Sequence, residues 1–239
     1  MPLVTETPAR RLTSAEISAA IDDVHWRFVL GTAHTSVPVR SLAEAADTAA
    51  ALARLVAGRG DRAGDSLLLD VRADRLVLVL RCPVASWLTP AEVDLARLIA
   101  QAVAARGQRL DPGLGGGAPR AVQALEIAID ALDIPRIRPF WRAVMGYADE
   151  PDGGAPTHPV VDPLGQGPAI WFQQMDAPRP QRNRIHLDVS VPHEEAPARI
   201  RAALAAGGRL VSDARAPAFW VLADAEGNEV CVCTWQGRD

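Results

Sequence analysis

The sequence contains no lysine, only three cysteines and no long apolar run, and each absence excludes a class of protein. Without lysine there is no Schiff-base amine and no P-loop lysine. Cys82, Cys231 and Cys233 are too few for a disulfide framework, so we expect reduced thiols. No apolar stretch approaches the roughly 18 to 20 residues that cross a bilayer, and the start lacks a signal-peptide core. We therefore expect a cytoplasmic protein with no membrane partner.

The composition of the 239 residues is that of a globular chain. It is 49% hydrophobic and 23% charged, with a net charge of −4, and all 25 basic residues are arginine. This length suits one large domain or two smaller ones. A slightly acidic chain lacks the basic excess of a nucleic-acid binder. We therefore expect a small molecule as partner, with no nucleic acid.

A stretch rich in glycine and proline divides the chain. The segment from Gly107 to Pro119 reads GQRLDPGLGGGAP, without any periodic apolar pattern. We interpret it as a linker between domains at residues 1–106 and 120–239. A long surface loop within one domain is the alternative.

In the first half, three helix starts carry a Ser or Thr followed three residues later by Glu, which is the capping-box pattern. These pairs are Thr13 with Glu16, Ser41 with Glu44, and Thr89 with Glu92. Alternating apolar segments separate them in pairs. The order is therefore αββαββα, with one antiparallel sheet covered by helices, which is an α+β fold.

The second half shows a different pattern, a βαβββ unit that occurs twice. A repeat of this kind usually makes one domain from two similar halves. The expected strands are Val122–Asp130, His158–Val161, Ala169–Met175, Ile185–Val191, Arg209–Asp213, Ala218–Ala223 and Glu229–Thr234, and the expected helices are Ile134–Val144 and Glu194–Ala206.

Three motifs of this half carry a family resemblance. FWRAVMGY, RIHLDVSV and WVLADAEGNEVCVC, in this order, resemble the glyoxalase, bleomycin-resistance and extradiol-dioxygenase group, the vicinal oxygen chelate superfamily. The resemblance covers roughly Ala121 to Trp235. It implies paired βαβββ modules forming a cupped sheet around a cavity, with a divalent metal on the inner wall in many members.

The first half, roughly Leu12 to Ala105, resembles pterin-4a-carbinolamine dehydratase. The element order fits, and LTPAEVDLARLIA is similar to the family's closing helix. The family's active site is built from histidines, however, and this chain has none between His34 and His158. Because histidine suits proton transfer near neutral pH, we expect a dehydratase-like domain without its catalytic histidines.

Strand alternation assigns four polar side chains to one wall of the expected cavity. Apolar residues alternate with Glu126, His186, Asp188 and Cys231 on their strands, so these four should lie opposite the helices. Asp188 follows His186 by two residues and can orient its imidazole. We predict His186 as acid or base, Asp188 as its orienter and Glu126 as a second proton-transfer group. In the alternative, His186 satisfies a buried hydrogen bond and Asp188 pairs with Arg182 or Arg184.

No cofactor is established by the sequence, and a divalent metal is an open alternative. The resemblance implies that Glu126, His186 and Cys231 would be the ligands, with cysteine where metal-binding members usually have glutamate. Three protein ligands suffice for an open zinc site. A cysteine on a strand is, on the other hand, commonly a small buried apolar residue.

Aromatic and amide side chains should contact the ligand. Trp171 and Trp220 lie on strands whose inner residues line the expected cavity and can stack on a flat ligand. Gln173 and Gln174 lie on opposite faces of their strand, so at most one of the two amides is expected in the cavity. Gln173 and Cys231 complete the expected binding set.

Three functions stay open. The first is a lyase or isomerase that uses acid–base chemistry for isomerisation, elimination, or ring opening and closure. The second is a binding or resistance protein for an aromatic or cationic compound. The third is a 4a-hydroxytetrahydrobiopterin dehydratase. The dehydratase resemblance also implies a homodimer.

Overall fold

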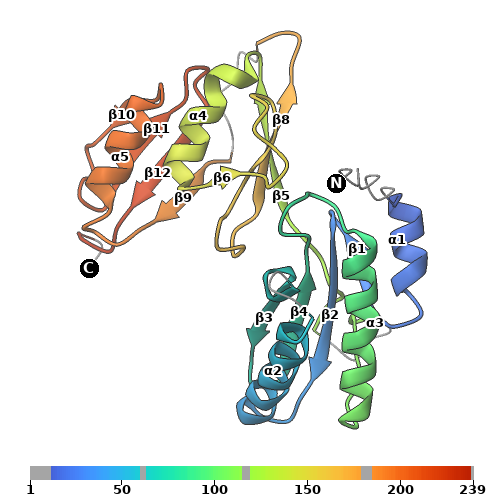
Figure 1. The fold of residues 1–239 in the computed structure, drawn as a ribbon. Coiled ribbons are helices and arrows are strands. Elements are labelled where there is room, and N and C mark those ends of the chain that lie inside the picture. The colour runs from blue at the N-terminus through green and yellow to red at the C-terminus, as the bar shows by residue number, and fades with distance from the viewer. Residues whose placement is uncertain (1–11, 60–62, 115–118, 179–184, 238–239) are drawn as a thin grey trace, which may run out of the picture. The chain divides into compact units, whose positions relative to one another are not determined.

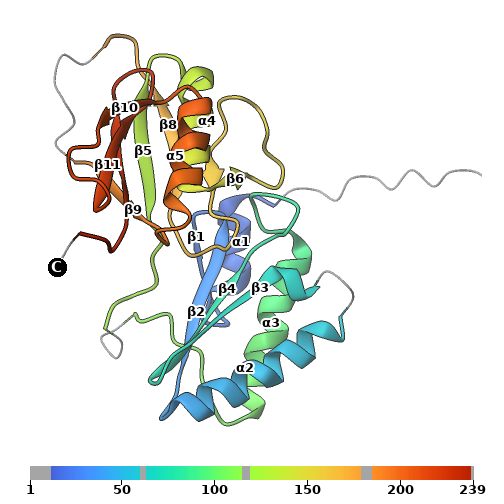
Figure 2. The same cartoon turned by 90° about the vertical axis from the view of Figure 1, so that its left-hand side faces the viewer.

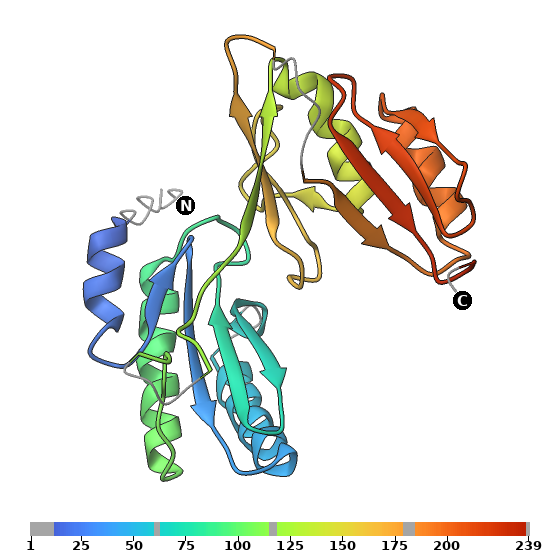
Figure 3. The same cartoon turned by 180° about the vertical axis from the view of Figure 1, so that it is seen from behind.

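The computed structural model describes residues 12–59, 63–114, 119–178 and 185–237. The chain divides into two compact units, Met1–Ala124 and Leu125–Asp239 (Figures 1, 2 and 3). No helix within the described ranges combines the length and the apolar character that spanning a membrane requires.

The first unit has one antiparallel sheet with the strand order β1-β2-β4-β3. Its elements follow the order helix, two strands, helix, two strands, helix, as the sequence pattern predicts, with a short 3-10 helix before β3. They are α1 (Ser14–Ile21), β1 (Arg27–Val29), β2 (Thr32–Pro38), α2 (Leu42–Ala57), the 3-10 helix (Ala63–Ser66), β3 (Leu67–Val71), β4 (Arg75–Leu80) and α3 (Pro90–Ala105). This order alone does not assign the unit to the dehydratases.

The helix starts of this unit are capped as predicted. The side chains of Thr13, Ser41 and Thr89 each accept a hydrogen bond from a backbone N–H in the first turn. At Thr13 and Thr89 the glutamate three residues later completes the reciprocal capping box. These local signals therefore fix the helix starts.

Part of the segment predicted as a linker packs on the first unit. The backbones of Asp111 and Ser36 exchange two hydrogen bonds, of 2.7 and 3.2 Å, beside strand β2. Leu110 is buried in the core of this unit. The chain is therefore held to the sheet at Leu110 and Asp111, ahead of the glycine-rich residues.

The second unit contains the βαβββ pattern twice. The first copy is β5 (Glu126–Ala131), α4 (Ile134–Met145), β6 (Ala148–Asp149), β7 (Val160–Val161) and β8 (Ala169–Gln174). The second copy is β9 (Leu187–Ser190), α5 (Ala196–Ala205), β10 (Arg209–Ser212), β11 (Phe219–Ala223) and β12 (Glu229–Cys233). The sheets have the orders β5-β8-β7-β6 and β10-β11-β12-β9, and β5 with β8 and β9 with β12 are parallel pairs.

One apolar core joins the two copies of the repeat. Helix α4 contributes Ile137, Phe140 and Trp141, which pack in one cluster with residues of both sheets, such as Ile170 and Val230. Helices α4 and α5 also contact each other directly. The second unit is therefore a single packed body.

Two buried polar groups connect helix α4 to the rest of this body. The indole Nε1 of Trp141 donates to Asp224 Oδ2 at 2.9 Å, and Asp224 is fully buried. Arg138, also buried, donates to Asp149 Oδ1 at 2.6 Å and to the backbone oxygen of His158. Since buried polar groups are costly without partners, both contacts help to fix α4.

Candidate functional site

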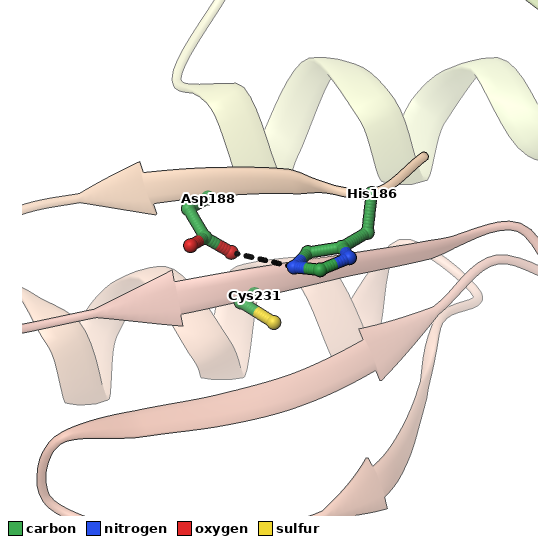
Figure 4. A group of neighbouring side chains, drawn as sticks. All are labelled: His186, Asp188 and Cys231. Atoms are coloured by element: carbon green, nitrogen blue, oxygen red, sulfur yellow. Dashed lines mark ion pairs between the residues drawn. The ribbon is translucent and has the colours of Figure 1, made fainter. Parts of the chain in front are cut away.

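The parallel pair β9 and β12 brings three predicted site residues together. Asp188 lies opposite Cys231 in the register, so both side chains project from the same face. His186 precedes β9 by one residue and shares this face with Asp188 by alternation. Figure 4 shows the three side chains close together beside β9 and β12. Their ligand atoms all lie within 4.8 Å of one another.

His186 and Asp188 form an ion-pair contact on this face. Nε2 of His186 lies 3.5 Å from Oδ1 of Asp188, drawn as the dashed line in Figure 4. The side chains are 61% and 55% exposed, so the imidazole is accessible to a ligand and is not held in a buried hydrogen bond. Arg182 and Arg184, the alternative partners for Asp188, lie outside the described residues.

A cavity of about 540 Å³ lies beside this pair. This volume is within the range of small-molecule sites. His186, Asp188 and Cys231 line it together with four residues that the sequence analysis does not single out, namely Arg215, Ala218, Phe219 and Gly237. The imidazole therefore has a hollow beside it.

The thiol of Cys231 is protonated at neutral pH. Burial raises its pKa to about 12, and a hydrogen bond to Asp188 adds to this shift. The thiol is therefore a weak hydrogen-bond donor and a poor nucleophile here.

We expect Cys231 to resist iodoacetamide at pH 8. With a pKa about four units above this pH, roughly one thiol in ten thousand is ionised. Replacing Asp188→Asn removes one cause of the shift and should raise the alkylation rate, whereas Ser190→Ala on the same strand should not. Peptide mapping by mass spectrometry measures the modification. Alkylation of wild-type Cys231 at the rate of a free thiol would contradict this pKa.

The remaining predicted residues lie elsewhere. Glu126, Trp171 and Gln173 belong to β5 and β8 in the other sheet and do not line this cavity. Burial raises the pKa of Glu126, and the charge of Glu150 adds to the shift. Glu126 is therefore not placed as a partner of His186.

The structure places Trp220 on the face opposite to the cavity. Trp220 lies opposite Val232 in the register and packs against the apolar core. Its neighbour Phe219 lies opposite Cys233, on the face that carries Cys231, and lines the cavity instead. The aromatic wall is thus Phe219.

The donor atoms fit a metal in type. The metal set that the resemblance implies includes Glu126, but the structure groups Asp188 with His186 and Cys231. Nitrogen, oxygen and sulfur donors suit zinc, and three protein ligands leave a position open for a ligand. Because the Cys231 thiol is protonated, binding would have to displace its proton.

The first unit has a cavity of its own, of about 590 Å³, lined by Ser66, Cys82 and Glu92 among others. No histidine is among its lining residues. Glu92 is buried and accepts hydrogen bonds from Thr89 and Ser66. Its carboxylate therefore acts in the helix cap, and the cavity lacks the imidazoles of the dehydratase resemblance.

Comparison with known families bears on the second unit. Residues 126–233 match the family model of the glyoxalase-like domain. These residues span β5 to β12, which form the two βαβββ copies. The glyoxalase-like domain thus includes the predicted sites on both sheets. No curated protein matches the chain.

Several solved structures are similar to this chain over less than half of its length. A glyoxalase/bleomycin resistance protein/dioxygenase family enzyme from Burkholderia phytofirmans PsJN is 18% identical, with 46% of this chain and 95% of that chain covered and a TM-score of 0.38. A glyoxalase-related enzyme from Fulvimarina pelagi is 18% identical, with 47% and 88% covered and a TM-score of 0.38. The fosfomycin resistance protein FosX from Listeria monocytogenes, complexed with Mn(II) and 1S,2S-dihydroxypropylphosphonic acid, is 13% identical, with 47% and 90% covered and a TM-score of 0.37.

Proposed function

We propose that the glyoxalase-like domain is a lyase or isomerase that moves protons on a small organic molecule beside His186. The contact between His186 Nε2 and Asp188 Oδ1, at 3.5 Å on the wall of a cavity, is the observation that carries this proposal. A neutral imidazole accepts a proton from the substrate, and Asp188 orients the ring and stabilises the imidazolium that forms. The imidazolium then returns the proton at another position or to a leaving group.

The other residues of the cavity have supporting roles in this proposal. The Cys231 thiol donates a weak hydrogen bond, and Phe219 provides an apolar wall. Glu126 has no role as second proton-transfer group because it does not line the cavity. A zinc ion held by His186, Asp188 and Cys231 would act as a Lewis acid on a substrate oxygen.

We expect replacing His186→Gln to lower turnover about 100-fold or more, since a positioned acid or base typically contributes 10²- to 10⁴-fold. Proton exchange next to the carbonyl group in D2O measures this by ¹H NMR, with phenylpyruvate and phenylacetone as probes. His158→Gln is the matched control, because its side chain is exposed and does not line the cavity. Equal exchange rates in wild type and His186→Gln would contradict the role of His186.

A binding or resistance protein is the second candidate. The absence of Glu126 from the cavity lining favours it, because the described lining then holds only one acid–base pair. Saturable binding of a probe that is recovered unchanged, without any proton exchange, would support this function. The pterin dehydratase activity and the homodimer stay predictions.

A further inference from the structure

The cavity beside His186 contains one charged side chain that no other described residue neutralises. Arg215 lines the cavity, and among the described residues its guanidinium has no hydrogen-bond or ion-pair partner. The carboxylate of Asp188, in contrast, is in contact with His186 and accepts a hydrogen bond from the Cys231 thiol. The positive charge is therefore the one available to a ligand.

Backbone hydrogen bonds hold the turn that carries Arg215. Arg215 lies in the turn before β11, where its backbone oxygen accepts hydrogen bonds from Ala218 and Phe219 at 2.8 and 3.3 Å. Ala218 and Phe219 themselves line the cavity. Arg215 and Phe219, four residues apart and joined by this turn, thus both line the cavity.

The register gives the backbone distance along the sheet between Phe219 and Asp188. Phe219 lies opposite Cys233, and Asp188 lies opposite Cys231, so the two positions differ by two residues along β12. Two residues of a strand span roughly 7 Å. A ligand that contacts both Phe219 and the pair of Asp188 with His186 is therefore a few bonds longer than a single functional group.

We propose that Arg215 binds the carboxylate of a small aromatic or apolar acid, whose flat part lies on Phe219 and whose reacting carbon faces His186. Arginine presents a planar fork of donors that matches a carboxylate in a bidentate pair. This proposal rests on the proposed function for the reacting end of the ligand, and the anion site stands on Arg215 alone. The proposed ligand is thus an anion, unlike the cationic compounds that the sequence analysis leaves open.

Binding of phenylacetate and of its uncharged analogue phenylacetamide to the full-length protein tests the anion site, measured by NMR titration. We expect wild type to bind phenylacetate about 10-fold more tightly than the amide, since hydrogen bonds to charged groups are the stronger ones. Arg215→Gln should remove this preference. Arg209→Gln is the matched control, because Arg209 is also exposed and has no side-chain partner among the described residues, but lies outside the cavity.

The outcomes separate the anion site from the chemistry. If His186→Gln keeps the preference for phenylacetate while proton exchange is absent from wild type, Arg215 binds anions and the proposed function fails. Equal affinities of wild type for the acid and the amide, absence of saturable phenylacetate binding, or an unchanged preference in Arg215→Gln would each overturn the anion site.

Discussion

Replacing Asp149→Ala should lower the free energy of unfolding of the glyoxalase-like domain by about 3 kcal/mol. Asp149 Oδ1 accepts from Arg138 at 2.6 Å, and the Arg138 side chain is only 8% exposed. Removing one partner of a buried pair leaves an unpaired charge, which typically costs about 3–5 kcal/mol. The lower end applies here, because the Asp149 side chain is 35% exposed and water reaches it. Urea unfolding followed by tryptophan fluorescence measures the loss.

The second partner of Asp149 provides the control. Arg142 donates to Asp149 Oδ2 at 2.9 Å, but its side chain is 49% exposed. Exposed pairs contribute at most about 1 kcal/mol, so Arg142→Met should have a small effect. Similar losses in Asp149→Ala and Arg142→Met would show that burial of Arg138 does not set the cost.

The same pair predicts how stability depends on pH. The hydrogen bond from Arg138 holds the pKa of Asp149 below its ordinary value, and Arg142 contributes to the shift. The unfolded chain then binds more protons than the folded one in this range. The stabilisation is therefore present above the ordinary pKa of an aspartate and is lost as the pH falls through the lower pKa of the folded state.

Replacing Asp224→Ala should destabilise the same domain by about 3–5 kcal/mol. The fully buried carboxylate accepts from Trp141 Nε1, from both nitrogens of Asn228 and from the backbone of Glu226, all at 2.8–2.9 Å. A buried donor left without a partner costs about 1–3 kcal/mol, which applies in full to the Trp141 indole. The donors of Glu226 and Asn228 are only partly buried and regain some water. Urea unfolding gives the cost, and the Trp141 indole N–H resonance reports the lost contact.

Two variants control this prediction. Asp224→Asn retains one oxygen for the backbone donors but turns an NH2 group toward the Trp141 indole, so we expect an intermediate loss. Asp213→Ala, at an exposed aspartate of the same unit, should change stability little. A loss in Asp224→Ala no larger than in Asp213→Ala would refute the role of this carboxylate.

Local signals in the sequence predict most of the elements, but not the short strand β6 (Ala148–Asp149), and half of the site. Strand alternation places His186 and Asp188 on one face, and the structure adds that Cys231 lies directly opposite Asp188. The segment AFWVLA is apolar at every position, so alternation could not choose between Phe219 and Trp220. The position of Glu126 depends on how two separate sheets pack, which no local pattern encodes.

Arg215 and the buried charges carry weaker signals. Arg215 lies in a turn, where neither periodicity nor a motif distinguishes it from other exposed arginines. Arg138 follows Ile134 by four residues and precedes Trp141 by three, and this helical spacing places it on the buried face. A charge on the apolar face of a helix is thus the pattern that could have indicated the pair with Asp149.

The turn between β11 and β12 has a consequence for the duplicated repeat. In this turn, Asp224 accepts a hydrogen bond from Trp141 of α4. The carboxylate of Glu226 accepts from the backbone N–H groups of Leu132 and Asp133, both at 2.7 Å, at the start of α4. The first copy of the repeat thus supplies the N–H donors, and the second copy supplies the carboxylates that accept from them. Helix α4 and its start in one half are therefore held by carboxylates of the other half, so substitutions at Asp224 or Glu226 act on both halves.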